Sequence, residues 1–133
     1  MKNEKKQAFL GEMNKKIINL VMHAASPEQG AFEPDNKAEV KDLLVFKDLP
    51  TTNEIRQRAH ILANIAGEYD ATHAMIGGAL YLMSHLERAL LTRGITPLYA
   101  FSERVSVEVV NDKGEVEKKS VFKHLGFIEV GYD

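Results

Sequence analysis

Two continuous apolar runs, separated by helical patterns, constrain the fold of this chain more than any other feature. Residues 17–22 (IINLVM) and 95–101 (ITPLYAF) are rich in β-branched, aliphatic and aromatic side chains and carry no charge. Runs of this kind are typical of strands that are covered on both faces. Because helical patterns separate them, we expect the two strands to lie parallel in one sheet.

The segment between these runs predicts three helices and one more strand. The first two helices are expected after Asn36 and Thr51, since each of these residues has a glutamate three positions later, in capping-box register. Residues 71–94 predict a short strand, a glycine turn and a third helix, with Gly94 as its stop signal. The polar stretch over residues 23–34 is predicted to be a long loop.

Beyond Phe101 the sequence changes character. A polar break at residues 102–104 is followed by valines that alternate with polar residues up to position 109. A turn over residues 111–114 (NDKG) and a returning strand over residues 115–130 then predict a β-hairpin with one face in water. The predicted fold class is therefore α/β: a Rossmann-like three-layer sandwich with a mainly parallel sheet and a C-terminal β-hairpin.

Length and composition narrow the class of protein further. The 133 residues suit a single domain over residues 1–133, in which residues 1–14 are expected to be a flexible extension. The absence of cysteine excludes disulfides, thiolate metal sites and cysteine nucleophiles. A formal net charge of −2 argues against a duplex nucleic-acid partner, although it leaves room for a small anionic ligand.

The sequence gives no sign of a membrane, metal or cofactor partner. No window is long and apolar enough for a signal peptide or a membrane span, so we expect a cytoplasmic protein. No HExxH or comparable spacing of metal ligands occurs, and no Walker loop or nucleophile elbow is present. We therefore expect no metal and no cofactor.

Open α/β sheets bind ligands beyond the carboxyl ends of their strands. This rule selects three segments of the chain, at residues 23–29, 77–78 and 102–104. Backbone amides at Gly77 and Gly78 can approach an anion closely, and the helix that follows directs its positive end to the same place. Arg104 can form a forked pair with a phosphate. The hydrogen-bonding candidates are Ser26, Gln29 and Ser102.

Plainer interpretations of the same residues stay open. A Gly-Gly pair between strand and helix is also typical of tight packing. Arg104 can be a solvated charge, and His23 can be a histidine that bonds to the loop backbone. The agreement of three separate segments carries more weight than any one of them.

The C-terminal half resembles a known family. The stretch GITPLYAFSERVSVE, a short DKG turn and SVFKHLGFIEV together resemble the C-terminal signature of small CRISPR-associated proteins. These are CARF-like, Rossmann-like ring nucleases, which degrade cyclic oligoadenylate second messengers in antiviral defence; phage or prophage relatives also occur. HAASPEQ, after the first strand, is similar to the family's histidine-to-glutamine loop. The likeness covers residues 72–130 and, more weakly, 17–29; at the MIGG turn the family instead has an acidic residue.

The resemblance implies a metal-independent ring nuclease. In such enzymes the ribose 2′-hydroxyl attacks the adjacent phosphorus. Arg104 would hold the phosphate, His23 would act as general base or acid, and Ser102 would complete the catalytic set. The residues implied to bind ligand are Ser26, Gln29, Gly77, Gly78 and His124.

A homodimer would match the two-fold symmetry of a cyclic oligoadenylate. Two alternatives from other classes remain. One is a non-catalytic binder of a cyclic nucleotide, acting as a sponge or a sensor. The other is a dimeric interaction protein whose hairpin pairs with a partner strand.

Overall fold

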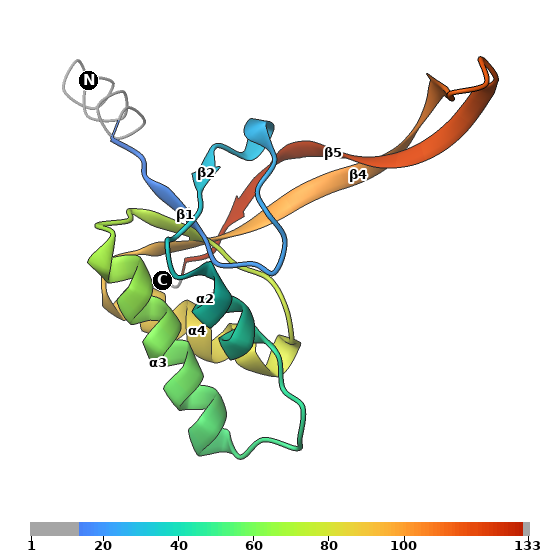
Figure 1. Ribbon diagram of the computed structural model, residues 1–133. Coiled ribbons are helices and arrows are strands. Elements are labelled where there is room, and N and C mark those ends of the chain that lie inside the picture. Colours follow the sequence, from blue (N-terminus) through green and yellow to red (C-terminus); the bar gives the residue numbers. More distant parts are fainter. Residues whose placement is uncertain (1–13, 132–133) are drawn as a thin grey trace, which may run out of the picture.

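The computed structural model describes residues 14–131 and shows a mixed α/β fold around one sheet (Figure 1). The predicted extension over residues 1–14 lies outside the described residues, apart from Asn14. The strands are β1 (Ile17–Asn19), β2 (Ala31–Phe32), β3 (His73–Met75), β4 (Thr96–Val110) and β5 (Val116–Glu129). The helices are α2 (Lys37–Leu44), α3 (Thr52–Glu68), α4 (Leu80–Thr92) and the short 3₁₀ helix η1 (Pro27–Gln29).

The sheet has five strands in the order β2-β1-β3-β4-β5. The pairs β1–β2, β1–β3 and β3–β4 are parallel, whereas β5 runs antiparallel to β4. The predicted α/β class, the mainly parallel sheet and the C-terminal hairpin are thus confirmed.

The helices begin where the sequence indicates. The Thr51 side chain accepts a hydrogen bond from the backbone N–H of Glu54, at 3.1 Å, and so caps α3 as expected. At the start of α2, Asn36 does not cap the backbone; its Nδ2 instead donates to the Glu39 carboxylate at 3.2 Å. Gly94, with φ of +73°, follows the end of α4.

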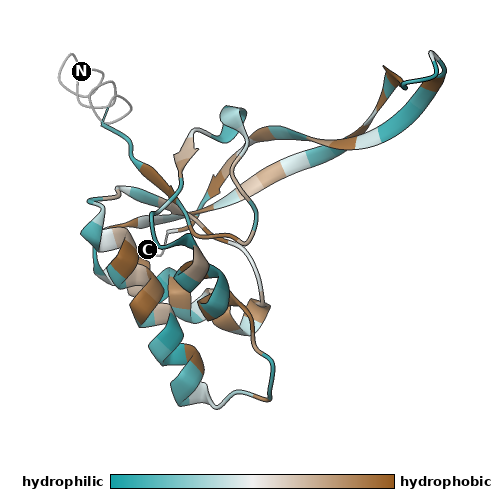
Figure 2. Cartoon of the chain, viewed as in Figure 1, coloured by the Kyte–Doolittle hydropathy of each residue, from teal (hydrophilic) through white to brown (hydrophobic). Residues whose placement is uncertain are grey.

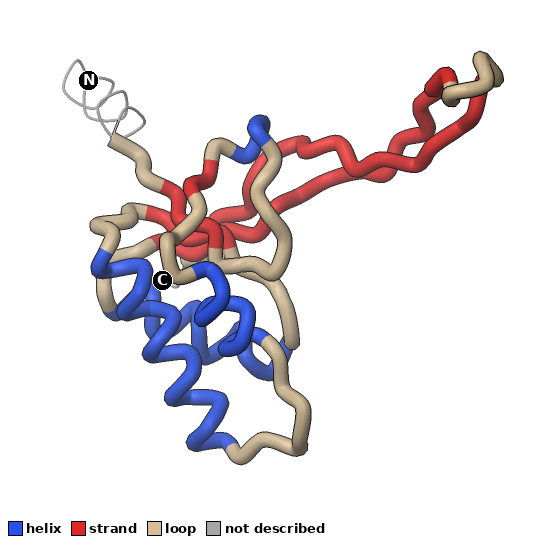
Figure 3. The backbone as a smooth tube through the Cα atoms, in the orientation of Figure 1, coloured by secondary structure: helices blue, strands red, loops and turns tan. Residues whose placement is uncertain are grey.

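The prediction of one long loop over residues 23–34 is wrong in part. It contains η1 and then β2, a two-residue strand that pairs with Ile17 and Ile18 of β1 (Figure 3). β2 was missed because two residues carry no measurable periodicity, and only the neighbouring strand identifies them as a strand.

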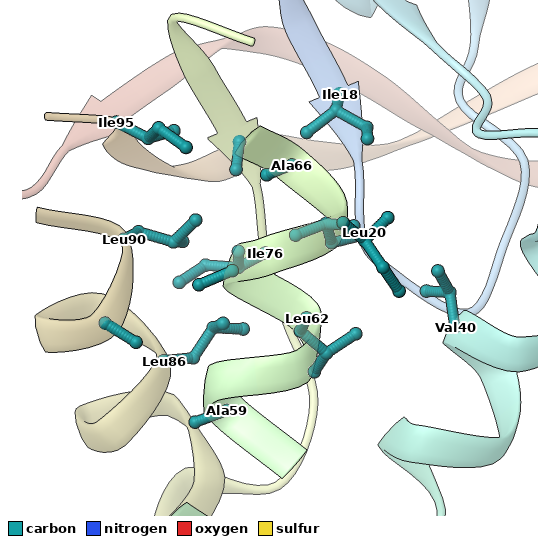
Figure 4. Packing of buried hydrophobic residues seen from close by; sticks show 14 of the residues in the cluster. Ile18, Leu20, Val40, Ala59, Leu62, Ala66, Ile76, Leu86, Leu90 and Ile95 are labelled. Atoms are coloured by element: carbon teal, nitrogen blue, oxygen red, sulfur yellow. The ribbon is translucent and has the colours of Figure 1, made fainter. Parts of the chain in front are cut away.

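All described α-helices contribute to a single core on one side of the sheet (Figures 1 and 4). Leu62 of α3 and Leu86 of α4 are fully buried, together with Ile18 of β1 and Ile76 just after β3. The opposite face carries a smaller cluster of Ile17, Met75 and Leu98, against which Val21, Ala25, Ala31 and Phe127 pack. The three-layer arrangement is therefore not confirmed, since no described α-helix joins this second cluster.

The direction of the crossovers explains the single helical layer. From β2 to β3 and from β3 to β4 the chain moves the same way across the sheet, so right-handed crossovers place α2, α3 and α4 on one side. The β1-to-β2 connection moves the other way, and its crossover belongs on the opposite face. That connection is only residues 20–30, with η1 in place of an α-helix.

The polar break at residues 102–104 does not end a strand, contrary to our expectation. β4 continues to Val110, paired with β5 throughout, and the two strands extend beyond the rest of the sheet as a long ribbon (Figure 1). The break coincides with a shift of register between Phe101 and Ser102, which leaves Leu125 of β5 unpaired. We call residues 101–126 the β arm.

Candidate functional site

The order of the strands reverses between β1 and β3, which places a topological switch point at their carboxyl ends. The loops that leave these two ends lie against each other. A Cβ on Gly77 would stand 3.4 Å from Cγ1 of Val21, an ordinary van der Waals contact. The first two predicted segments, residues 23–29 and 77–78, thus follow neighbouring strand ends as expected.

A buried asparagine fixes the loop after β1. Asn19 has no exposed surface, and its Nδ2 donates to the carbonyl of His23 at 2.8 Å and to both carboxylate oxygens of Glu33 at 2.9 Å. Its Oδ1 accepts from the N–H of Val21 at 2.9 Å. Lys37 of α2 pairs with Glu33 at 3.0 Å and donates to the carbonyl of Val21 at 2.7 Å. These contacts tie β1, its loop and α2 together.

Sequence reasoning missed this network. The available signal was a polar residue inside an uninterrupted apolar run, because a buried amide needs partners for its donors and acceptor. The only side-chain partner of Asn19 among the described residues, Glu33, lies 14 positions away in the chain, and Lys37, which pairs with Glu33, lies four positions further on. Local sequence patterns could not identify them.

The same network alters the ionisation of Glu33. Burial raises the pKa of its carboxyl, but hydrogen bonds from Asn19, the N–H of Ala25 and Lys37 together outweigh burial and lower the pKa. A carboxyl with a lowered pKa in the folded state stabilises the fold above its unfolded pKa, about 4.3. That stability is lost as the pH falls through the folded-state pKa.

We therefore expect acid to destabilise the wild type more steeply than Glu33→Gln. The test is to measure the urea midpoint of unfolding for both proteins from neutral to acid pH. Below the pKa of glutamate in the unfolded chain, the midpoint of the variant should fall less than that of the wild type. If both proteins lost the same stability as the pH fell, Glu33 would not contribute to the acid sensitivity of the fold.

The glycine turn leads into a helix whose N-terminus has no side-chain cap. Ala79 is the N-cap residue of α4 and makes no side-chain hydrogen bond to the helix, and Gly78 before it has φ of +142°. The positive end of a helix of 13 residues therefore lies beside the switch point. This arrangement agrees with the anion site that the sequence predicted.

Ser26 and Gln29 have local structural partners. The Oε1 of Gln29 accepts from the N–H of Ser26 at 3.0 Å, which stabilises η1. The Nε2 group of Gln29 is not used in this contact. His23 is exposed, and its backbone carbonyl, not its ring, is what Asn19 holds.

The other predicted residues lie on the β arm. Ser102 and His124 face each other across β4 and β5, and the Arg104 guanidinium lies 5.1 Å from the ring centroid of Phe122. The His124 ring packs on Phe127 at 4.8 Å, with its Nδ1 buried and without a hydrogen-bond partner. Along β4, Ser102 and Arg104 share a face with Leu98, which belongs to the second cluster.

The loop after β1 meets the sheet at η1, which contacts β5. η1 lies between Ser26 and Gly30, and Ala25 packs with Phe127 of β5 in the second cluster. Ser26, Gln29, Ser102 and His124 are thus on the same side of the sheet. No hydrogen bond or ion pair joins the loop residues to Ser102, Arg104 or His124 within residues 14–131.

One surface pocket of the described chain lies away from this site. Its volume is about 620 Å³, and it contains none of the predicted site residues. Its lining residues are Met22, Lys41, Asp42, Val45, Lys47, Asp48, Glu54 and Arg58.

Arg58 in this pocket has a structural role. It donates to the carbonyl of Val45 at 2.6 Å, pairs with Glu54 at 2.9 Å and stacks on Phe46 at 4.2 Å. It thereby satisfies carbonyl groups at the end of α2, as cations at helix C-termini do.

Two further features are absent from the part of the chain that the structure describes. No group of three or more His, Cys, Asp or Glu side chains there could hold a metal ion. None of the helices there has the length and apolar character that crossing a bilayer requires.

The fold and the switch point define a small α/β protein with a long C-terminal β arm and a candidate anion site. The sequence matches the family described as "Uncharacterized protein MJ1673 family" over residues 15–128. Because the match covers most of the chain, the protein belongs to this family. No curated protein and no solved structure matches the chain.

Proposed function

We propose that the protein binds cyclic oligoadenylates at the carboxyl edge of its parallel strands and cleaves them as a ring nuclease. The observation that carries this proposal is the uncapped N-terminus of α4 behind Gly77 and Gly78, beside the loop from β1 at the switch point. A helix N-terminus and free backbone amides at this place suit a phosphodiester. The likeness to CARF-like ring nucleases supplies the class of ligand.

A Rossmann-like relationship is part of this proposal. The strand order and the helical crossovers from β2 onward support it. On this interpretation, the loop over residues 20–30 takes the place of the helix that would complete a third layer. The proposal keeps the cytoplasmic location predicted from the sequence.

The proposed reaction needs no metal. A base removes the proton of a ribose 2′-hydroxyl, whose oxygen attacks the adjacent phosphorus. The bond from phosphorus to the 5′-oxygen breaks, and that oxygen takes up a proton. The products are a 2′,3′-cyclic phosphate and a 5′-hydroxyl. His23 would accept the first proton, and Ser102 and Arg104 would contact the phosphate oxygens.

The position of Ser102 and His124 is compatible with an extended ligand. Both lie on the side of the sheet where Ser26 precedes η1 and Gln29 ends it. A ring of several phosphates that starts at the α4 N-terminus would pass η1 before it reaches the arm.

The test is incubation of the purified full chain with cyclic tetra-adenylate and cyclic hexa-adenylate in EDTA. Linear products with cyclic phosphate ends are expected, separated by chromatography and identified by mass. Intact ligand after incubation with and without added metal would exclude the enzymatic proposal.

Arg104→Ala is expected to lower the turnover of the cleaved ligand at least about tenfold, because the variant lacks a charge partner for the phosphate. Lys113→Ala, in the exposed turn of the hairpin, is the matched control and should cleave like wild type. Circular dichroism checks that both variants are folded. Wild-type turnover in Arg104→Ala would remove this residue from the mechanism.

A second candidate is binding without cleavage, as a sponge or sensor. It is favoured by the exposed His23 ring, which no hydrogen bond orients in the described structure, whereas catalytic bases are usually held by a partner. Calorimetry with cyclic tetra-adenylate, followed by recovery of the intact ring from the bound fraction, distinguishes it from the nuclease.

A further inference from the structure

The β arm exposes large apolar side chains over much of its length. Figure 2 shows apolar residues in brown at several places along it. The Phe122 side chain is 72% exposed and that of Val110 is 71% exposed. An isolated two-stranded ribbon is only marginally stable in water, so such an arm is expected to gain stability from a partner. The other apolar residues exposed on the arm are Phe101, Val107, Val116, Val121 and Leu125.

One edge of β4 is available for pairing along the arm. The carbonyl of Pro97 accepts from Val130 on the β5 side, whereas that of Leu98 accepts from Ile76 on the β3 side. Odd-numbered residues of β4 thus bond to β5, and even-numbered ones point to the other edge. β3 ends opposite Leu98, and no other described strand covers that edge beyond it.

The alternation along β4 continues into the arm. The register shift adds its extra residue to β5, not to β4. The N–H of Asn111, just after β4, again bonds to the β5 side, where it donates to Glu115 at 2.9 Å. The backbone groups of Arg104, Ser106 and Glu108 therefore point to the free edge.

The two edges of the ribbon differ in their protection against pairing. β5 carries three lysines, at positions 118, 119 and 123, a common device that keeps edge strands from pairing. Over residues 102–110, β4 has neither lysine nor proline. The unprotected edge is the one that belongs to β4.

The sequence of β4 is complementary to itself in one antiparallel register. With Ser106 opposite its own copy, Arg104 stands opposite Glu108, and Val105 opposite Val107. Opposite charges and pairs of β-branched residues both favour such cross-strand positions. A centre at Arg104 or at Glu108 would instead place like charges opposite each other, and a centre at Val105 or Val107 would leave Arg104 without its acidic partner.

We propose that the free edge of β4 pairs with β4 of a second copy of this chain, antiparallel, about a two-fold axis at Ser106. The result is a four-stranded ribbon in the order β5-β4-β4-β5, with ion pairs between Arg104 and Glu108 on both sides of the axis. The valines at positions 105, 107 and 109 of both copies then form one apolar strip. This pairing does not depend on the proposed ligand.

Cysteine cross-linking tests the register, since the natural chain has no cysteine. In Ser106→Cys the two Cα atoms would be about 5.5 Å apart, within the range of disulfides. The control is Ser120→Cys, because Ser120 pairs with Ser106 across the ribbon. It would lie about 14 Å from its copy, across three strand spacings.

Oxidation should convert Ser106→Cys, and not Ser120→Cys, into a covalent dimer on a non-reducing gel. A dimer formed only by Ser120→Cys would show pairing through β5 and overturn the proposal. Absence of cross-linking in both variants, with normal circular dichroism, would overturn it as well.

A charge exchange tests the contacts. Arg104→Glu and Glu108→Arg should each raise the dimer dissociation constant at least about tenfold, and the double variant should restore it. Glu103→Arg, which faces the other side of the ribbon, should have little effect. Sedimentation of the full chain without nucleotide measures these constants. A double variant as weak as the single ones would refute the register. The nuclease proposal is tested separately, by cleavage with the wild-type chain.

Discussion

Replacing Asn19 by alanine is expected to lower the free energy of unfolding by about 2–4 kcal/mol. The Asn19 amide makes hydrogen bonds to His23, Glu33 and Val21, at 2.8–2.9 Å, and is completely buried. Alanine would leave a small cavity and an unpaired N–H at Val21. The Glu33 carboxylate would also lose the hydrogen bond that Asn19 donates to it. Loss of a hydrogen bond to a charged group lowers stability more than loss of one between neutral groups.

Asn36→Ala is the matched control for this prediction. Asn36 precedes α2 and makes only a 3.2 Å side-chain bond, to Glu39, and its Oδ1 is buried without a partner. Its replacement should cost less than about 1 kcal/mol. Urea unfolding of both variants gives the comparison. Equal losses for the two asparagines would show that the Asn19 network contributes no special stability.

The contrast between these asparagines shows what local sequence can predict. The pattern after Thr51 predicts a capped helix, and the cap forms, because every group that it needs lies within four residues. The same pattern after Asn36 correctly predicts the start of α2 but not the contact that Asn36 makes. Helix positions are therefore predictable here, while individual side-chain partners are less so.

The β arm shows a different limit. The alternating valines predict a hairpin, and the turn near Gly114, with φ of +78°, lies where the sequence indicates. The polar residues after Phe101 nevertheless suggested the end of a buried strand. β4 continues past them because β5 pairs with it, and that pairing joins residues as far apart as Leu98 and Glu129. Whether a polar break ends a strand depends on such distant partners.

The candidate site was predictable to a similar extent. The rule for parallel strands correctly places residues 77–78 at the switch point, since it depends on strand order alone. It misplaces Arg104, which lies on the arm over Phe122 and not at a strand end. Arg104 also has two possible partners, a ligand phosphate and Glu108 of a second copy. The two proposals assign it to different contacts, so the charge exchange and the cleavage assay can be interpreted separately.

Replacing Gly78 by alanine is expected to cost about 1–3 kcal/mol of stability, through the backbone and not through a clash. Its φ of +142° is a conformation that L residues rarely adopt, while an added Cβ would meet nothing closer than Cε of Met83, at 3.8 Å. Gly77→Ala is the matched control, because its Cβ would make an ordinary contact with Val21 at 3.4 Å. It should cost less than about 0.5 kcal/mol.

The same pair of variants also probes the proposed ligand site. If Gly78 fixes the direction in which α4 presents its N-terminal amides, Gly78→Ala should weaken binding of cyclic tetra-adenylate even under conditions in which it is fully folded. Gly77→Ala should bind more nearly as the wild type does, since its backbone needs no unusual φ. Thermal unfolding and calorimetry on both variants separate the two effects. Loss of stability in Gly78→Ala without any loss of binding would leave the turn a purely structural role, and the anion would then have to bind elsewhere on the sheet edge.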